Sequence, residues 1–138
     1  MTAKILVIDN DAAVRHLLEV RLKQAGYQVS TIADSSSAFD RVRVERPDVV
    51  ITTILASGLD GLSLTRQLKS QPDFSPLVIL LTPLNSDSDI AAGFAAGADD
   101  YLTKPFSPLV LIERVRVNLI RTGRLVTTAQ EESEIVDD

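Results

Sequence analysis

Five short apolar runs alternate with helical patterns along the chain, and this alternation constrains the fold more than any other feature. Val, Ile, Leu and other strand-forming residues dominate the runs, which predict strands at 4–9, 28–32, 49–53, 77–82 and 101–103. Each run is followed by a segment with helical periodicity or capping residues. These segments lie near residues 11–26, 35–45, 61–68, 87–96 and 108–121. Repeated strand–helix units predict a parallel sheet covered by helices on both faces. The expected fold class is therefore α/β, as a three-layer doubly wound (βα)5 domain.

Composition narrows the function classes. The chain of 138 residues has no cysteine, so disulfides and cysteine-ligated metals are excluded. Its net charge of −5 disfavours direct binding of nucleic acid, because phosphate neutralisation needs clustered Lys and Arg. The sequence shows no secretory leader and no apolar run long enough to cross a bilayer. We therefore expect a cytoplasmic protein that binds neither membrane nor nucleic acid directly.

The end of the chain differs from the rest in composition. Residues 123–138 contain Glu131, Glu132, Glu134, Asp137 and Asp138 and few apolar residues. Such a segment cannot bury enough apolar surface to offset its ordering entropy. We predict a folded domain over 1–122 and an acidic tail or linker stub over 123–138.

Four polar residues stand at the carboxyl ends of predicted strands: Asp9, Thr53, Thr82 and Lys104. In doubly wound folds these ends meet at one edge of the sheet, where the functional site lies. Each residue alone has an ordinary structural interpretation. Asp9 could cap a helix, threonine is common at strand ends, and Lys104 could be a solvated loop residue. Four at matching strand ends indicate a site.

The same four residues, together with the run Gly97-Ala98-Asp99-Asp100-Tyr101-Leu102-Thr103-Lys104-Pro105-Phe106, carry a resemblance to a known family. From residue 4 to about 121 the chain resembles the receiver domain of bacterial two-component signalling. The resemblance implies a flavodoxin-like fold with strand order 2-1-3-4-5. It also implies that Thr82 and Tyr101 are the switch residues, that Lys104 pairs with phosphate, and that the Lys104–Pro105 bond is cis.

The sequence departs from the family's pattern at two acidic positions. The acidic pair of the family falls on Asp9 and Asn10, and its phosphorylated aspartate falls on Thr53. A complete site of the family, with three carboxylates and one lysine, has a formal net charge of −2. In this chain Asp9 and Lys104 alone remain, and their formal net charge is 0. Mg²⁺ needs anionic oxygen ligands, so we expect weak or absent Mg²⁺ binding and no cofactor. We expect Asp9 to pair with Lys104, Thr53 to donate to one of them, and Asp11 to cap the following helix.

The leading hypothesis is an atypical receiver, or pseudo-receiver, that is not an enzyme and signals by protein–protein interaction without aspartyl phosphorylation. Its partner would be an output domain, a kinase or another regulator. The face formed by the fourth helix, fifth strand and fifth helix could also support a homodimer. Candidate residues on this face are Ile90, Phe94, Asp99, Asp100, Val110, Arg114 and Arg116.

Two alternatives remain open. Thr53 or Thr82 could be modified by a Ser/Thr kinase, which would place phosphate beside Lys104. The segment Ile8-Asp9-Asn10-Asp11 also resembles the nucleophile motif of haloacid-dehalogenase-like phosphohydrolases, with Asp9 as nucleophile. The order of residues argues against the enzyme, because the acidic pair Asp99-Asp100 precedes Lys104 instead of following it.

Overall fold

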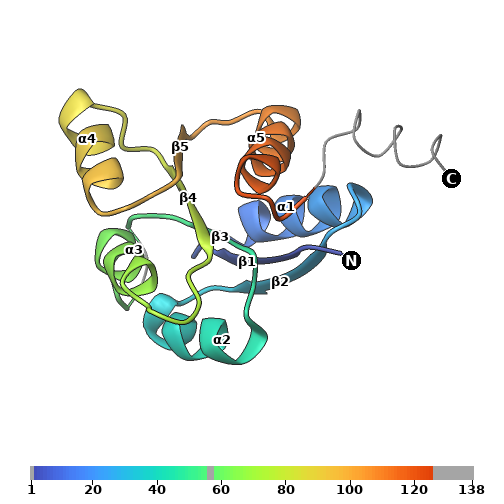
Figure 1. Cartoon of the computed structure of the whole chain (residues 1–138). Helices are drawn as coiled ribbons and strands as arrows, with labels where there is room; N and C mark the ends of the chain where they lie inside the picture. The colour runs from blue at the N-terminus through green and yellow to red at the C-terminus, as the bar shows by residue number, and fades with distance from the viewer. Residues whose placement is uncertain (1, 56–57, 126–138) are drawn as a thin grey trace, which may run out of the picture.

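A parallel five-stranded sheet in the order β2-β1-β3-β4-β5 forms the centre of the computed structural model, which describes residues 2–55 and 58–125 (Figure 1). Helices follow the strands, as the alternating pattern predicts. The elements are β1 (Lys4–Ile8), α1 (Ala12–Gln24), β2 (Gln28–Ile32), the 3₁₀ turn η1 (Ser35–Ser37), α2 (Ala38–Glu45), β3 (Val49–Thr52), α3 (Gly61–Lys69), β4 (Leu77–Thr82), α4 (Asp87–Ala95), β5 (Asp100–Thr103) and α5 (Pro108–Arg121). The doubly wound fold and its strand order are confirmed.

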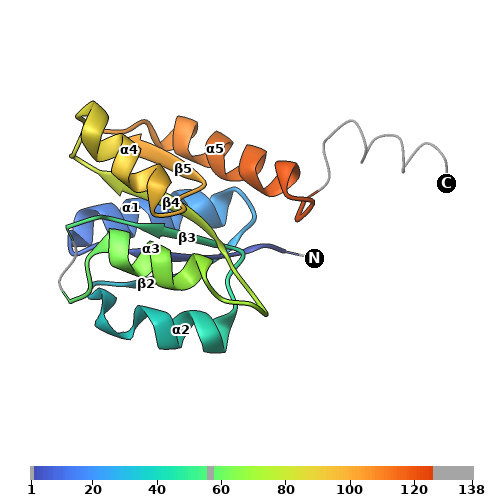
Figure 2. The ribbon, with the colours of Figure 1, turned by 60° about the vertical axis from the view of Figure 1, so that its left-hand side comes forward.

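The helices form two layers, one on each face of the sheet. Helices α1 and α5 cover one face, and α2, α3 and α4 cover the other (Figures 1 and 2). Two apolar clusters fill the spaces between the layers. Successive residues of one strand belong to different clusters, as Ile5 and Leu6 do. The reason is that successive side chains of a strand point to opposite faces of the sheet.

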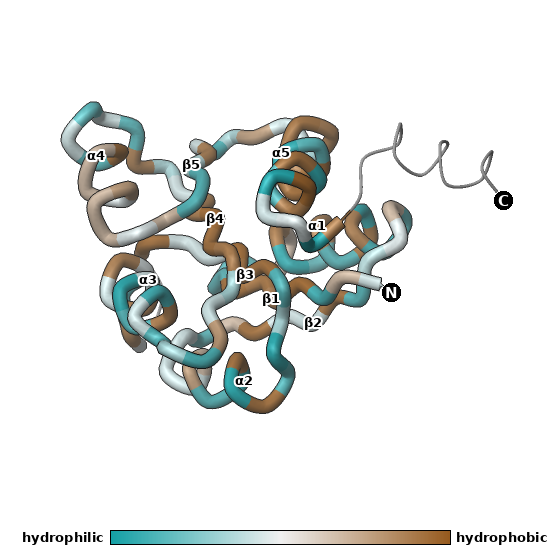
Figure 3. Tube along the Cα trace, viewed as in Figure 1, coloured by the Kyte–Doolittle hydropathy of each residue, from teal (hydrophilic) through white to brown (hydrophobic). Residues whose placement is uncertain are grey.

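The central strands are buried from end to end, and the edge strand is not. Every residue of β3 and β4 is buried, whereas β2 has none that is fully buried. Figure 3 shows the corresponding concentration of hydrophobic residues along the inner strands. The sheet register sets Ile8 beside Thr52, which brings the next residues, Asp9 and Thr53, to one edge of the sheet.

Contacts with the domain continue past residue 122, the predicted end of the folded domain. Leu125 packs against the cluster under α1 and α5. The Arg124 guanidinium donates to the carbonyl oxygens of Asp48 and Ser75, at 3.2 and 2.8 Å. These contacts extend the folded part through residue 125, and the rest of the predicted tail, 126–138, lies outside the described residues.

Within the described ranges, none of the helices is both long enough and apolar enough to cross a membrane.

Candidate functional site

A buried ion pair joins the first and last strands of the predicted cluster. The Lys104 ammonium lies 2.7 Å from Oδ2 of Asp9, whose side chain is only 2 % exposed. The second carboxylate oxygen, Oδ1, accepts the N–H of Asp11 at 2.9 Å. Both oxygens of Asp9 are therefore engaged within the domain. The predicted Asp9–Lys104 pair is confirmed.

Thr53 lies beside this pair but does not bond to it. Thr53 is 3 % exposed. Its backbone N–H donates to Ile8 O at 3.1 Å, and this hydrogen bond extends the pairing of β1 and β3 by one residue. The prediction that its hydroxyl donates to Asp9 or Lys104 is wrong, since the described structure contains neither bond. Asp9 accepts instead from Lys104 and from the N–H of Asp11.

Asn10 and Asp11 follow Asp9 but differ in what they contact. Asn10 is exposed, so the amide that replaces the family's second acid lies at the rim of the cluster. Asp11 caps α1, and its Oδ1 accepts from Ala13 N at 2.9 Å and Val14 N at 3.4 Å. The predicted helix cap is confirmed.

The two predicted switch residues are held inside the domain. Thr82 is fully buried, and its hydroxyl oxygen accepts a long hydrogen bond of 3.4 Å from Leu84 N. The Tyr101 hydroxyl donates to Leu84 O at 2.7 Å. Both residues therefore bond to Leu84 in the connection between β4 and α4. Burial raises the pKa of Tyr101 above its ordinary value, and the nearby charge of Asp89 raises it further.

Gly93 makes room for the tyrosine ring. A Cβ atom on Gly93 would lie 2.7 Å from Cδ2 of Tyr101 and 2.9 Å from Cδ1 of Leu80. Any side chain at this position of α4 would overlap the ring. The rings of Phe94 and Tyr101 are also neighbours, with centroids 6.4 Å apart. Sequence reasoning missed Gly93; its signal is a glycine inside a helix that is otherwise unbroken.

Few acidic groups come together at this edge of the sheet. No three His, Cys, Asp or Glu side chains come together as potential metal ligands within residues 2–55 and 58–125. Asp9 is the buried carboxylate of the cluster, and Lys104 already occupies one of its oxygens. An amide at 10 and a hydroxyl at 53 carry no charge to offset the dehydration of a divalent cation.

The predicted charges on the face of α4, β5 and α5 are paired within the chain. Asp100 receives two hydrogen bonds of 2.7 Å from Arg114 and one of 3.0 Å from Asn118. Asp99 lies 2.9 Å from Lys69, and Arg116 pairs with Glu113. The assignment of these residues to a dimer face stays a prediction. The apolar members Phe94 and Val110 are about half exposed, and Ile90 packs on the core.

Asp100 supports a prediction about pH. Burial alone would raise the pKa of Asp100, but hydrogen bonds from Arg114, Tyr101 N–H and Asn118 and the charge of Arg114 lower it overall. The pKa of Asp100 in the unfolded chain is about 4. Because the pKa is lower in the folded protein, Asp100 stabilises the fold above about pH 4, and this stability is lost as the pH falls through the folded-state pKa. We expect Asp100→Asn to lower the free energy of unfolding at pH 7 by about 1–2 kcal/mol.

Urea unfolding at pH 7 and at pH 3 measures this effect, and the cost of Asp100→Asn should shrink at the lower pH. Glu113→Gln, which removes the charge of the exposed partner of Arg116, is the matched control and should leave the midpoint unchanged. An equal cost at both pH values would show that charge on Asp100 contributes nothing.

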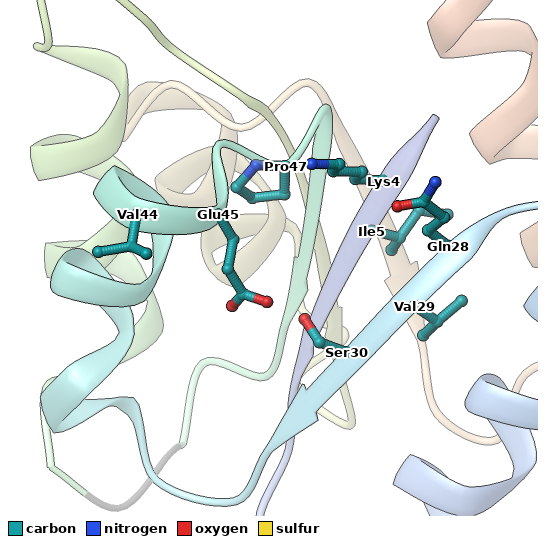
Figure 4. Close-up of a pocket in the computed structure, with 8 residues that line it drawn as sticks. All are labelled: Lys4, Ile5, Gln28, Val29, Ser30, Val44, Glu45 and Pro47. Atoms are coloured by element: carbon teal, nitrogen blue, oxygen red, sulfur yellow. The ribbon is translucent and has the colours of Figure 1, made fainter. Parts of the chain in front are cut away.

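A hollow of about 220 Å³ lies far from the cluster (Figure 4). It is bordered by the first residues of β1 and β2, Lys4 and Gln28, and by the end of α2. Asp9 and Lys104 lie at the opposite ends of their strands. This hollow is therefore separate from the candidate site.

Comparison with known proteins gives the family. The model for the response regulator receiver domain matches residues 5–116, which is most of the chain. The chain belongs to the response regulator receiver domain family. The structural match agrees: the BeF3-activated receiver domain of Klebsiella pneumoniae RstA has a TM-score of 0.79 and 32 % identity, covering 84 % of this chain and 97 % of that one. A receiver domain of a Francisella response regulator has a TM-score of 0.82 and 32 % identity, with 88 % and 99 % covered.

Curated relatives of this receiver domain are about twice its length. Response regulator MprA of Mycolicibacterium vanbaalenii is 43 % identical over 122 residues, which cover 88 % of this chain and 52 % of the relative. The probable transcriptional regulator ycf27 of Guillardia theta is 40 % identical, with 88 % and 47 % covered. This receiver domain is thus a signalling domain of response regulators, and the chain spans about half the length of these relatives.

Two further contacts at the receiver site were not predicted. Arg15 donates to the backbone carbonyl of Asp9 at 2.7 Å, which fixes the end of β1 from the first turn of α1. The β3–α3 loop is held by the Ser35 hydroxyl, which donates to Leu59 O. Neither contact leaves a periodic signal in the sequence. The cis Lys104–Pro105 bond, by contrast, was implied by the family resemblance and is confirmed.

Proposed function

We propose that this receiver domain signals by contact with another protein and without phosphorylation of an aspartate. The observation that carries the proposal is the residue at the end of β3. Thr53 occupies it, and the neighbouring Asp9 is already bound to Lys104 and to Asp11 N–H. An alcohol needs a base or a metal to become a nucleophile. The nearest charged groups, Asp9 and Lys104, are bonded to each other, so neither is available to activate the Thr53 hydroxyl.

The metal expectation forms part of this proposal. Asp9 with Asn10 and Thr53 supplies one carboxylate where the family's site has three, so Mg²⁺ would bind weakly if at all. No step of the proposed mechanism passes through a metal ion. The domain instead holds one arrangement of Asp9, Lys104, Thr82 and Tyr101 and presents a surface that depends on it.

The surface best suited to a protein partner lies over β5 and α5. A shallow hollow of about 320 Å³ is lined there by Tyr101, Leu102, Thr103, Phe106, Ser107, Val110 and Arg114. Val110 is 50 % exposed and Phe94 of α4 is 48 % exposed, so apolar area is available beside the polar rim. An output domain, a kinase or a second copy of this chain are the partners we propose for this face. Light scattering after size exclusion distinguishes the second copy, because a monomer at every concentration removes it.

Phosphorylation of Thr53 or Thr82 by a Ser/Thr kinase is a weaker candidate. The two residues are 3 % and 0 % exposed, so neither hydroxyl is accessible to another enzyme's active site without local opening. The phosphohydrolase alternative also gains no support. Asp99 and Asp100, its required acidic pair, are bound to Lys69 and Arg114 and not to the Asp9 cluster.

The proposal is tested by adding Mg²⁺ and the phosphoryl mimic beryllofluoride to the ¹⁵N-labelled chain. We expect the amide resonances of Thr82 and Tyr101 to stay in place, because the cluster offers no aspartate for the mimic and little charge for the metal. Saturable shifts confined to residues 9–11, 53, 82 and 101–104 would overturn the proposal. Proton spectra before and after the addition give the control for a folded sample.

A further inference from the structure

A second surface feature lies on the face away from α1 and α5. A groove of about 250 Å³ runs between α2 and α3, and we refer to it as the α2–α3 groove. Phe39, Val42 and Phe74 supply apolar walls, while Arg43 and Arg46 are exposed at its border. The exposed acid at the groove is Asp73, so the border carries a net formal charge of +1. An apolar floor with a cationic border fits an acidic segment that also contains aliphatic residues.

The two arginines are available for such a segment. Their neighbour Arg41 is paired with Glu45 at 2.7 Å, but Arg43 and Arg46 have no carboxylate partner within the described residues. The Arg46 guanidinium lies over the Phe74 ring, 4.5 Å from its centroid. Arg46 also holds the left-handed backbone conformation that ends α2, with φ 49°, where glycine would be unstrained.

The last described residues contact backbone that adjoins this groove in sequence. The Arg124 side chain bonds to the carbonyls of Asp48 and Ser75, which lie two residues after Arg46 and one residue after Phe74. Leu125 N–H donates to Leu119 O at 3.2 Å and fixes the direction in which the chain leaves α5. Figure 2 shows the end of α5 on the same side of the molecule as the connection from α3 to β4.

The charge of the chain is concentrated in the segment that follows. Five of its nineteen acidic residues and none of its fourteen basic residues lie at 126–138, so residues 1–125 are formally neutral and the segment alone carries the net −5. The acids Glu131, Glu132, Glu134, Asp137 and Asp138 surround an apolar pair, Ile135-Val136. This composition matches both the floor and the border of the groove.

We propose that residues 131–138 dock in the α2–α3 groove of their own chain. Ile135 and Val136 would cover the walls formed by Phe39, Val42 and Phe74, and the flanking carboxylates would pair with Arg43 and Arg46. Five residues, 126–130, separate Leu125 from the docking segment and span roughly 17 Å when extended. They start from the residue after Arg124, which already bonds to the backbone of Ser75, the neighbour of Phe74. Because the contact is intramolecular, a weak intrinsic affinity is sufficient. Docking there leaves the face of α4, β5 and α5 free for a partner.

A spin label tests this placement. The chain has no cysteine, so Ser133→Cys creates a single attachment site for a nitroxide. In the full ¹⁵N-labelled chain we expect Arg43, Arg46, Gln71 and Phe74 to lose most of their amide signal at low salt. The loss should disappear at about 1 M salt, where the Debye length is about 3 Å. Broadening centred on another face, or none at any salt concentration, would overturn the proposal.

Charge variants separate docking from an effect on folding. The first variant replaces three acids of the segment together: Glu131→Gln, Glu132→Gln and Glu134→Gln. All three lie after residue 125, so the variant should abolish the broadening and leave the spectrum of the domain unchanged. Arg43→Glu with Arg46→Glu should abolish it as well, and Glu→Lys at 131, 132 and 134 in that background should restore it. Asp73→Asn should strengthen it, because an acid leaves the border. Arg21→Glu on α1 is the matched control and should leave the broadening unchanged.

A mixing experiment identifies the chain that supplies the segment. A ¹⁵N-labelled, unmodified chain is combined with an unlabelled chain that carries the nitroxide at position 133. No broadening is expected in this mixture. Broadening of the groove residues in the mixture, without broadening within one chain, would make a second copy the occupant and overturn the intramolecular docking.

Discussion

The double variant Asn10→Asp, Thr53→Asp is expected to bind Mg²⁺ on the order of 10- to 100-fold more tightly than the natural chain. The two substitutions return the cluster from a formal charge of 0 to −2, with Asp9 and Lys104 unchanged. Beryllofluoride should then shift the amides of Thr82 and Tyr101, which the natural chain leaves in place. Calorimetric titration of Mg²⁺ and the same NMR spectra measure the two effects.

Stability provides an independent readout of the same variant. Without metal, three neighbouring carboxylates against one lysine repel each other, so the melting temperature should fall by several degrees. Saturating Mg²⁺ should reverse the fall, because a ligand that binds only the folded state stabilises it. Asn10→Asp alone is the control: it should gain some Mg²⁺ affinity but no response to beryllofluoride. An absence of metal binding in the double variant would locate the obstacle in the geometry of the loops and not in the charge of the site.

Replacing Lys104 with methionine is expected to destabilise the domain by about 3 kcal/mol. The substitution keeps an apolar chain of similar length but leaves the Asp9 carboxylate, whose side chain is 2 % exposed, with only the Asp11 N–H as a partner. Removing one member of a buried ion pair leaves an uncompensated charge, and that is the main cost. Urea unfolding at pH 7 measures it.

Two variants test the origin of the Lys104 effect. Asp9→Asn combined with Lys104→Met removes the isolated charge and should recover a large part of the loss, which gives the coupling between the two residues. Lys23→Met removes the lysine of an exposed pair, with side chains 54 % and 38 % exposed, and should have little effect. An unchanged free energy of unfolding for Lys104→Met would mean that water reaches Asp9 once the lysine is gone.

Sequence reasoning placed all five strands to within one residue at each end. Strands 28–32 and 77–82 were predicted to the residue, one at the exposed edge of the sheet and one fully buried, because apolar, β-branched runs with clear turn signals at both ends define them. The strands ending at Asp9 and Thr53 were each predicted one residue too long, although both residues occupy the expected edge. The Asp9–Lys104 pair also followed from the sequence, since opposite charges at neighbouring strand ends attract within a site shielded from water.

The details that sequence reasoning missed depend on side-chain direction. The hydroxyl of Thr53 was predicted to bond to the pair, but which oxygens of Asp9 are free depends on the backbone N–H of Asp11. Asp99 and Asp100 were assigned to one face together. Successive residues of an extended chain point to opposite sides, so Asp99 reaches Lys69 of α3 and Asp100 reaches Arg114 of α5. Strand alternation alone would have separated these two acids.

Three contacts hold Tyr101. Its hydroxyl donates to Leu84 O, one edge of its ring packs against Gly93, and its ring lies near that of Phe94. A side chain fixed in this way cannot turn outward by small steps, because the hydrogen bond and the ring contact must be lost in one event. The surface that we propose for a partner around α4 and β5 is therefore pre-organised. A partner that binds there would cost little conformational entropy at Tyr101, so a modest contact area would be enough for a specific complex.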